Sequence, residues 1–329
     1  MLRDRLDMLE SILPELYDDS ILNEAYSLLA PCERLDPDNQ AIVNRAMTQL
    51  IEGLYHVRVN SSDQEWNSFV KICLNHPLKD LLHQDPFTFR AFSKPRGYAG
   101  DAVLLDFIYG REEHWPPPTD TTPLGRMIYE YTTTAPASAG SCARRGFVAD
   151  KIDSLAMEID RPELLSIACG HMREASLSSA VRRNKTGRFL GLDSDTSSLE
   201  TVQQCYGRNG IEVVPASIRH LLTNRIDLGQ FDMVYSTGLF DYLQQKIGQR
   251  LAENMFEMVK PGGRMLIANV LPNIRDVGYM ESYMDWTLIP RTRKDMIDLT
   301  SNIPEPLIRD VRVFSEENVN IIFLELTKK

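Results

Sequence analysis

The sequence predicts an α/β protein in which an all-helical first part precedes a doubly wound parallel sheet that closes with an antiparallel hairpin. From Leu164 onward, short apolar runs alternate with helical segments, a pattern typical of parallel strands buried on both faces. The last two apolar runs are separated only by residues 315–318, which indicates a hairpin. Residues 1–92 instead repeat apolar side chains at helical spacing.

Each expected strand is a short apolar run followed by polar or small residues. The runs cover residues 164–168, 189–192, 211–214, 231–235, 265–270, 311–314 and 319–326. A helix is expected from about Cys142 to Ile159, and another from Gln245 to Val259. The second should end at Gly262 and Gly263, because glycine after a helix is a stop signal.

The first part of the chain predicts helices at residues 6–13 and 42–54, where apolar side chains fall on one helical face. Ser62 and Glu65 have the spacing of a capping box that begins a third helix. The proline-rich stretch at 115–118 is expected to be a hinge or linker. We therefore predict a helical, lid-like substrate domain over 1–135 and a second domain over 136–329.

Composition excludes several function classes. The chain of 329 residues carries a formal net charge of −10 and has no long run of Lys or Arg, so nucleic acid is an unfavourable partner. No apolar run reaches the roughly 20 residues that span a bilayer, and the N-terminus lacks a signal-peptide core. Neither the five cysteines nor the six histidines have metal-ligand spacing. We expect a cytoplasmic protein that acts on a small molecule, with no metal and with homo-oligomerisation left open.

The first motif that carries chemistry is residues 166–174 (SIACGHMRE), which follow a strand and open a helix. At such a turn the backbone passes close to a ligand, and glycine permits the approach. Only Gly170 remains of the usual glycine set; Ala168 is a near substitute, whereas Met172 is not.

Asp193 ends the next strand, 23 residues after Gly170. An acid about 20 residues past a glycine-rich turn is placed to accept hydrogen bonds from both ribose hydroxyls. The alternative is a solvated loop aspartate. Asp195 is interpreted as a helix N-cap.

Three further motifs follow in order along the chain. Residues 215–218 (PASI) follow the third strand, and residues 231–242 (FDMVYSTGLFDY) are a buried strand with a small, polar turn at the sheet's carboxyl edge. Open α/β sheets bind ligands at that edge. Residues 258–267 (MVKPGGRMLI) are a helix end, a tight turn and the next strand.

In this order and at these spacings, the five motifs resemble the class I S-adenosylmethionine-dependent methyltransferases over residues 160–329. The resemblance implies a seven-stranded, Rossmann-like methyltransferase sheet with S-adenosylmethionine as cofactor. Glu174, or a residue from the N-terminal part of the chain, is expected to compensate for Ser166, which stands where the family has an acid. The implied cofactor residues are Ala168, Gly170 and Glu174 at the methionine part, Asp193 and Ser194 at the ribose, Ser217 and Ile218 at the adenine, and Thr237, Gly238 and Leu239 near the sulfonium.

A second resemblance covers more of the chain. Residues 94–101 (KPRGYAGD), 235–242 and 283–286 (YMDW), followed by Arg291 and Thr292, resemble a bacterial methyltransferase group with a helical N-terminal domain. That group is often labelled for biosynthesis of a 3-hydroxypalmitic acid methyl ester signal. The chain also resembles the bacterial methionine S-methyltransferases.

Two segments are the candidates for acceptor binding and catalysis. In the first, Arg96 suits a carboxylate, Asp101 suits an amine, and Tyr98 could stack on either; an Arg96–Asp101 ion pair at the domain junction is the alternative. The second, residues 279–291, could form an aromatic wall beside the sulfonium, or pack as an amphipathic helix. The predicted catalytic residues are Tyr98, Tyr242 and Trp286, and the predicted substrate-binding residues are Arg96, Asp101, Tyr235, Asn269, Tyr279, Tyr283 and Arg291.

The acceptor is the least determined feature. A hydroxyl or amine acceptor needs a base, for which His171, Tyr235 and Tyr242 are candidates, but no His–Asp pair is identifiable in the sequence. This favours a base-free acceptor, such as the thioether of methionine or a carboxylate. The alternatives are an O-methyltransferase that makes a hydroxy fatty acid methyl ester, an NAD-dependent oxidoreductase, and a non-catalytic regulatory protein with a methyltransferase-like fold.

Overall fold

The computed structural model describes residues 19–30, 35, 38–113, 118–272 and 274–329, and divides into two compact units. Unit 1 comprises Met1–Ala139 and Asn273–Thr287, and unit 2 comprises Gly140–Pro272 and Leu288–Lys329. The boundary at Ala139 lies close to the one expected at residue 135, but the return of Asn273–Thr287 to unit 1 was not expected. The helix predicted at 6–13 and most of the proline-rich stretch lie outside the described residues.

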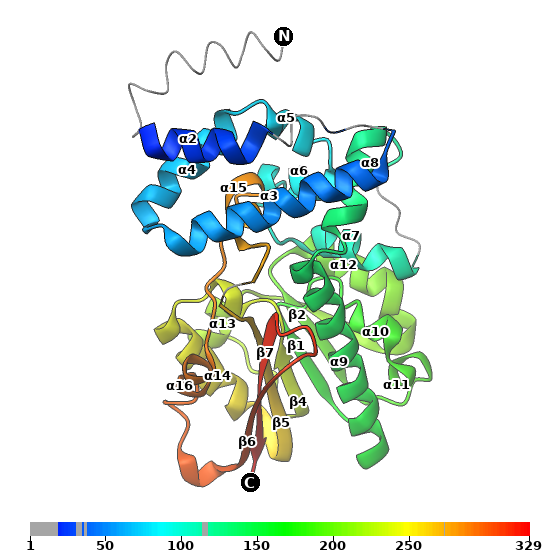
Figure 1. Ribbon diagram of the computed structural model, residues 1–329. Coiled ribbons are helices and arrows are strands. Elements are labelled where there is room, and N and C mark those ends of the chain that lie inside the picture. Colours follow the sequence, from blue (N-terminus) through cyan, green and yellow to red (C-terminus); the bar gives the residue numbers. More distant parts are fainter. Residues whose placement is uncertain (1–18, 31–34, 36–37, 114–117, 273) are drawn as a thin grey trace. The chain divides into compact units, whose positions relative to one another are not determined.

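Unit 2 is built on a seven-stranded sheet, which confirms the predicted fold class (Figure 1). The strand order is β3-β2-β1-β4-β5-β7-β6, in which β1 to β5 run parallel and β7 pairs antiparallel with both β5 and β6. The strands are β1 (Leu164–Ile167), β2 (Phe189–Asp193), β3 (Ile211–Pro215), β4 (Phe231–Ser236), β5 (Val259–Val270), β6 (Ile308–Ser315) and β7 (Ile321–Lys328).

One strand begins earlier than expected. The turn predicted at residues 260–263 lies inside β5, because Val259 already pairs with Phe231 of β4. A register shift between Phe231 and Met233 absorbs the extra residues. Gly262 has a φ of 79°, which glycine adopts without steric cost.

Helices cover both faces of the sheet, which is why the parallel strands are almost wholly apolar (Figure 1). On one face, α13 (Ile218–Leu222), α14 (Gln245–Glu257) and α16 (Arg293–Asp298) bury a core that includes Leu324 of β7. On the other lie α9 (Pro136–Glu158), α10 (Glu174–Leu177) and α11 (Ser179–Arg182). Phe147 of α9 packs 4.4 Å from the ring of Phe323, the residue that precedes Leu324. Alternate residues of β7 thus serve opposite cores. The remaining elements of unit 2 are α12 (Thr196–Tyr206), η3 (Gly207–Asn209), η4 (Phe240–Tyr242) and η5 (Glu305–Leu307).

Unit 1 is helical, as predicted. The capping box of α4 is present: Glu65 N–H donates to Ser62 Oγ (3.3 Å), and the Glu65 carboxylate accepts from Ser62 N–H (2.8 Å). Its helices are α2 (Asp19–Leu29), α3 (Gln40–Asn60), α4 (Asp63–Asn75), α5 (Leu78–Leu82), α6 (Pro86–Ser93), α7 (Ala102–Glu113), α8 (Pro123–Thr132) and α15 (Val277–Tyr283). Within the described residues, no helix is both long and apolar enough to cross a membrane.

Helix α15 explains why residues 273–287 fold with unit 1. A Cβ at Gly278 would lie 2.6 Å from the backbone of Leu54 in α3, so only glycine lets the two helices approach this closely. Arg58 of α3 pairs with Glu281 of α15 at 2.7 Å. The segment that connects β5 to β6 therefore supplies a core helix to the helical unit.

Candidate active site

The turn after β1 takes three left-handed steps. Ala168, Gly170 and Met172 have φ values of 53°, 52° and 49°, although only the middle one is glycine. The sign of φ therefore changes repeatedly along the turn, and Gly170 N–H is directed at the Asp193 carboxylate (2.8 Å). The backbone thus keeps the shape of a glycine-rich turn where two side chains replace glycine, at a cost of about 1–2 kcal/mol for each left-handed non-glycine residue.

The side chain of Met172 is accommodated by Gly191 of β2. Met172 is 1% exposed, and a Cβ at Gly191 would lie 2.5 Å from Met172 Sδ and 3.0 Å from Cys169 Sγ. The glycine missing from the turn is therefore matched by a glycine in the neighbouring strand. Burial, Asp193 and Glu174 raise the pKa of the Cys169 thiol, so this cysteine stays protonated.

Asp193 fastens the end of β2 to this turn. Its carboxylate accepts from Gly170 N–H (2.8 Å) and from Asp195 N–H (2.9 Å), and the residue is 9% exposed. A carboxylate offers about four lone-pair sites, so capacity remains for two ribose hydroxyls. Ser194 beside it is exposed, and Asp195 caps α12 as expected, accepting from Ser197 N–H (3.1 Å).

A tyrosine–glutamate pair lies at the carboxyl ends of β1 and β4. Tyr235, fully buried in β4, donates from its hydroxyl to Glu174 Oε1 at 2.7 Å. Burial raises the pKa of Glu174 against the opposing effect of this hydrogen bond and of Arg144 and Arg145. Burial, and then the Glu174 charge, raise the pKa of Tyr235 well above 10. The phenol is thus held as a hydrogen-bond donor.

Arg144 and Arg145 of α9 are residues that the sequence reasoning missed. They are 7% and 4% exposed; Arg144 Nη1 donates to the carbonyl of Thr237 (2.5 Å) and lies 3.9 Å from Asp241 Oδ2. Both guanidinium groups act on the Glu174 carboxyl. The available signal was two adjacent arginines in a helix otherwise rich in small residues directly before β1.

The turn after β3 joins the same edge. Ala216 N–H donates to the carbonyl of Asp193 at 2.9 Å, which ties this turn to the end of β2. Ser217 caps α13: its N–H donates to His220 Nδ1 (3.1 Å), which also lies 3.1 Å from Ser217 Oγ. Ile218 packs on the core beneath. The backbone thus brings together two of the turns assigned to the cofactor.

Hydrogen bonds from the buried side chain of Arg291 hold the segment that follows β4. This side chain is 1% exposed, and its guanidinium donates to Asn269 Oδ1 (2.6 Å) and to the carbonyls of Phe240 (2.5 Å) and Leu243 (2.5 Å). Asp241 Oδ1 accepts from Val270 N–H at 2.7 Å, and burial raises its pKa to about 6. Arg291 and Asn269 thus already bond to the residues that position Thr237, Gly238 and Leu239.

The candidate acceptor residues of the first segment lie in unit 1. Asp101 is fully buried and accepts two hydrogen bonds from Arg90 (2.9 and 2.7 Å) and one from Leu104 N–H (2.8 Å), so it caps α7. Asp101 is thus paired with Arg90 of α6. Arg96 is half-buried, and Tyr98 is 39% exposed.

The aromatic candidates divide by exposure. Tyr279 and Tyr283 of α15 are buried with rings 5.6 Å apart, and Tyr279 shares a hydroxyl hydrogen bond with Thr88 (2.9 Å). Trp286, also in unit 1, is half-buried. Tyr242, in η4 of unit 2, is 38% exposed and directly follows the turn after β4.

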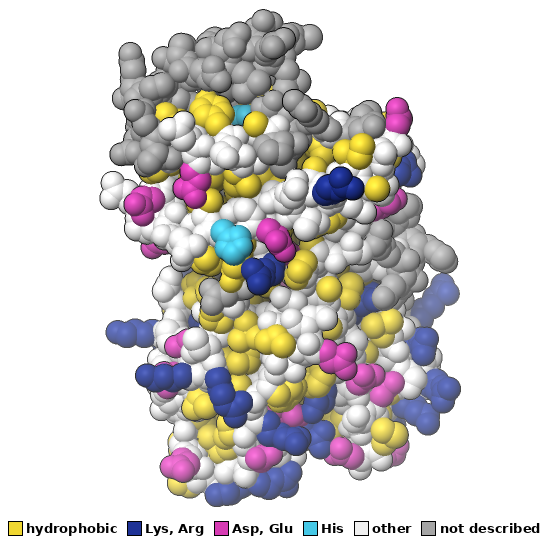
Figure 2. Space-filling view, in the orientation of Figure 1, with side chains coloured by type: hydrophobic (Ala, Val, Ile, Leu, Met, Phe, Trp, Pro, Cys, Tyr) yellow, Lys and Arg dark blue, Asp and Glu magenta, His cyan; other side chains and the backbone are white. Residues whose placement is uncertain are grey.

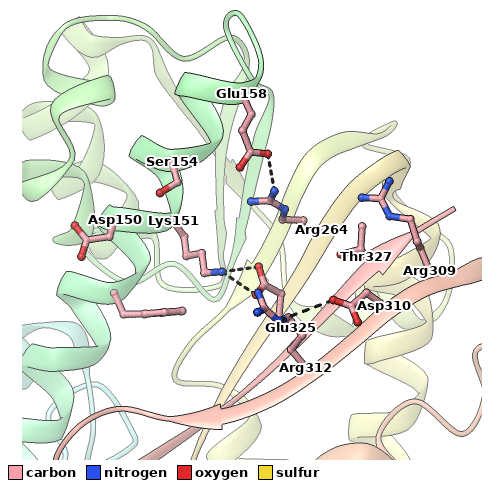
Figure 3. A pocket seen from close by; sticks show the side chains of 11 residues that line it. Asp150, Lys151, Ser154, Glu158, Arg264, Arg309, Asp310, Arg312, Glu325 and Thr327 are labelled. Atoms are coloured by element: carbon pink, nitrogen blue, oxygen red, sulfur yellow. Dashed lines mark hydrogen bonds and ion pairs between the residues drawn. The ribbon is translucent and has the colours of Figure 1, made fainter.

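A separate hollow of about 590 Å³ lies between α9 and the strands β5, β6 and β7 (Figure 3). Opposite charges pair across its lining: Lys151–Glu325 at 2.7 Å, Arg264–Glu158 at 2.5 Å and Arg312–Asp310 at 3.9 Å. The first two pairs fasten α9 to the sheet; none of the predicted cofactor residues lines this hollow.

Residues 164–263 match the family described as "Methyltransferase domain". The chain therefore contains a methyltransferase domain, which covers 100 of its 329 residues. The match runs from the first residue of β1 into β5, and thus includes every turn described above for unit 2. This match favours a methyltransferase over the oxidoreductase alternative.

Solved structures are similar to this chain at low sequence identity, and the first of them shares its fold. A "possible exported protein" from Bordetella parapertussis is 14% identical over 91% of this chain and 98% of its own, with a TM-score of 0.55. A TehB-like SAM-dependent methyltransferase from Corynebacterium glutamicum is 16% identical over 55% and 86%, with a TM-score of 0.40. Magnesium protoporphyrin IX methyltransferase from Synechocystis is 9% identical over 59% and 84%, with a TM-score of 0.42. No curated protein matches significantly.

We predict that Ala168→Gly leaves the stability of the protein unchanged or raises it by up to about 1 kcal/mol. Glycine relieves the left-handed strain, although it increases the entropy of the unfolded chain. Thermal unfolding checks this, with Ala252→Gly in α14 as control. The control removes a fully buried methyl group and should cost about 1 kcal/mol or more. Equal losses in both variants would contradict the left-handed turn.

We predict that Asp193→Ala weakens S-adenosylmethionine binding at least tenfold, because two ribose hydrogen bonds to a charged acceptor are lost. Asp193→Asn should lose less, since one oxygen remains to accept. Isothermal titration of both variants measures the effect. Unchanged affinity in Asp193→Ala would remove Asp193 from the cofactor site.

Proposed function

We propose that the protein transfers the methyl group of S-adenosylmethionine to a small molecule whose accepting atom carries no proton. The acceptor is then the thioether sulfur of an amino acid such as methionine, or a carboxylate oxygen. The state of Tyr235 supports this most directly: it donates to Glu174, and its pKa lies well above 10. A phenol held protonated is a poor general base near neutral pH.

Asp241 is a further acidic group at this edge, and its oxygens are also engaged. One accepts from Val270 N–H, and the other lies 3.9 Å from Arg144. Its role in the proposal is to orient the turn after β4. A thioether or carboxylate presents a lone pair directly, so the reaction needs positioning and exclusion of water more than proton transfer.

A charged cluster formed by Glu174, Arg144 and Arg145 fits the zwitterionic end of the cofactor. In the proposal, Glu174 binds the ammonium group, and Arg144 binds the carboxylate. An ammonium beside Glu174 would lower the raised pKa of that carboxyl, because an opposite charge favours the ionised form. This arrangement compensates for Ser166, which cannot supply the charge of the usual acid.

The remaining site residues have proposed roles of unequal weight. Tyr98, Tyr242 and Trp286 keep exposed or half-buried rings and are proposed to face the sulfonium, where aromatic faces attract a cation. Arg96 is the proposed ligand of the acceptor. Asp101, Tyr235, Asn269, Tyr279, Tyr283 and Arg291 already have protein partners or deep burial, and we assign them positioning roles.

The proposed setting is the cytoplasm, with a small molecule rather than nucleic acid as acceptor. The net charge of −10 supports this assignment, because an acidic protein repels a phosphate backbone.

The deciding experiment incubates the protein with methyl-labelled S-adenosylmethionine and a panel of acceptors, followed by mass spectrometry. The panel contains amino acids including methionine, thiols, and carboxylic acids including 3-hydroxy fatty acids. A labelled sulfonium or methyl ester is expected, with kcat nearly constant between about pH 7 and 9 because no base must ionise. A product labelled on a hydroxyl or amine would overturn the base-free acceptor. No cofactor binding at all would favour the regulatory alternative.

We predict that Arg96→Ala raises KM for the acceptor about tenfold or more while the cofactor Kd changes less than about twofold. The forked guanidinium provides two hydrogen bonds to a carboxylate. Arg96→Lys, which keeps the charge but loses the fork, should fall between. Equal changes in both constants would move Arg96 to the cofactor or to the framework.

A further inference from the structure

Strand β6 forms one edge of the sheet, next to β7 alone. The backbone N–H of Glu316 donates to the carbonyl of Ile321 (3.3 Å). By alternation, even-numbered residues of β6 direct their backbone groups toward β7, and odd-numbered residues direct theirs outward. The bond from Arg293 to the carbonyl of Val313 agrees with this alternation. The N–H and C=O of Val311 therefore point away from β7, toward the open edge of the sheet.

The side chains around Val311 are exposed and oppositely charged. Asp310 and Arg312 project from the same face of β6, 3.9 Å apart, with side chains 57% and 65% exposed (Figure 3). Val311 lies between them on the other face and is 42% exposed. An open edge that presents a hydrophobic residue is a template for another strand.

We propose that β6 pairs antiparallel with β6 of a second copy of this chain, about a two-fold axis at Val311. In this register, Asp310 lies opposite Arg312 of the partner subunit, and Arg312 lies opposite Asp310 of the partner subunit. Both charged pairs form on one face by symmetry, at the distance where cross-strand pairs interact. The charges of β6 are thus complementary to those of an identical strand that runs antiparallel to it.

Backbone and apolar groups support the same pairing. Val311 N–H donates to the carbonyl of the partner's Val311, and the reciprocal bond forms by symmetry. Ile297 of α16, which packs on β6, and Leu307, which directly precedes β6, are 43% and 47% exposed, and the second copy covers them. The carbonyl of Val313 can accept a further bond beside that of Arg293, since it has two lone pairs.

The pairing is closed rather than open-ended. The register shift between Ile308 and Asp310 ends the regular edge on one side, as bulges do in natural edge strands. An isologous contact uses the same patch on both copies and leaves no second β6 edge free. Figure 2 shows acidic and basic side chains intermixed, with hydrophobic ones among them, over the end of unit 2 at which the chain terminates.

The test measures mass in solution over a concentration series, by analytical ultracentrifugation of the full chain. Wild type is expected to be a dimer. Asp310→Arg sets two arginines opposite each other across the axis, and Arg312→Asp sets two acids opposite each other; each is expected to raise the dimer Kd about tenfold or more. Glu200→Arg, at an exposed position of α12, should leave the Kd within about twofold, because surface changes away from the interface have little effect on it.

Mixing the two variants distinguishes the register from a folding defect. Asp310→Arg and Arg312→Asp are each expected to dimerise only weakly alone and to form a heterodimer with near wild-type Kd when combined, because both cross-strand pairs are then attractive. The double variant carrying both changes should dimerise by itself. A monomeric wild type, or a dimer that neither single variant weakens, overturns the proposal. A mixture of the two variants that stays monomeric also overturns it, because the charged pairs of the proposed register would then have no effect.

Discussion

The site depends on one constraint: the chain must leave β1 sharply at the point where the strand order reverses. β1 lies between β2 and β4, so the connections on its two sides leave toward opposite faces, and a crevice opens at the carboxyl ends. The left-handed steps at Ala168, Gly170 and Met172 make that exit. The bond from Gly170 N–H to Asp193 then fixes the spacing between the turn and β2, and the turns after β3 and β4 are positioned from there.

At the carboxyl edge of the sheet, polar and charged groups bond to one another within the protein. Arg291 anchors the turn after β4 through carbonyls, and Tyr235 occupies Glu174. Several carboxyls nevertheless have raised pKa values, among them Glu174 and Asp241. Charge held in a poorly solvated place is costly, and a zwitterionic ligand offsets that cost by bringing both signs. The same cluster is therefore held by bonds within the protein and remains favourable to a charged ligand.

Most of the fold could be predicted because its signals are local. Apolar runs, the Ser62–Glu65 cap and the Asp195 cap are all encoded within a few residues. Helix α15 could not be assigned to unit 1, because its fit depends on Leu54, far away in the chain. Residue type alone also does not distinguish residues that bind a ligand from residues that hold the fold together. Asp101 could bind an amine, but its carboxylate already accepts two hydrogen bonds from Arg90. Arg144 and Arg145 could not be predicted to be buried, because buried arginines produce no periodic pattern in the sequence.

The chain passes between the two units at three points, since Asn273–Thr287 returns to unit 1 before β6 begins. During synthesis, α3 is complete long before α15 has been made. The contact between Leu54 and Gly278 therefore cannot form until most of unit 2 has been synthesised. Unit 1 therefore cannot close its core ahead of unit 2, although it comes first in the chain. Contacts so distant in sequence slow folding, and until α15 arrives its binding surface on α3 is open. The insertion thus makes the completion of the helical unit a late event that depends on the sheet's own connection.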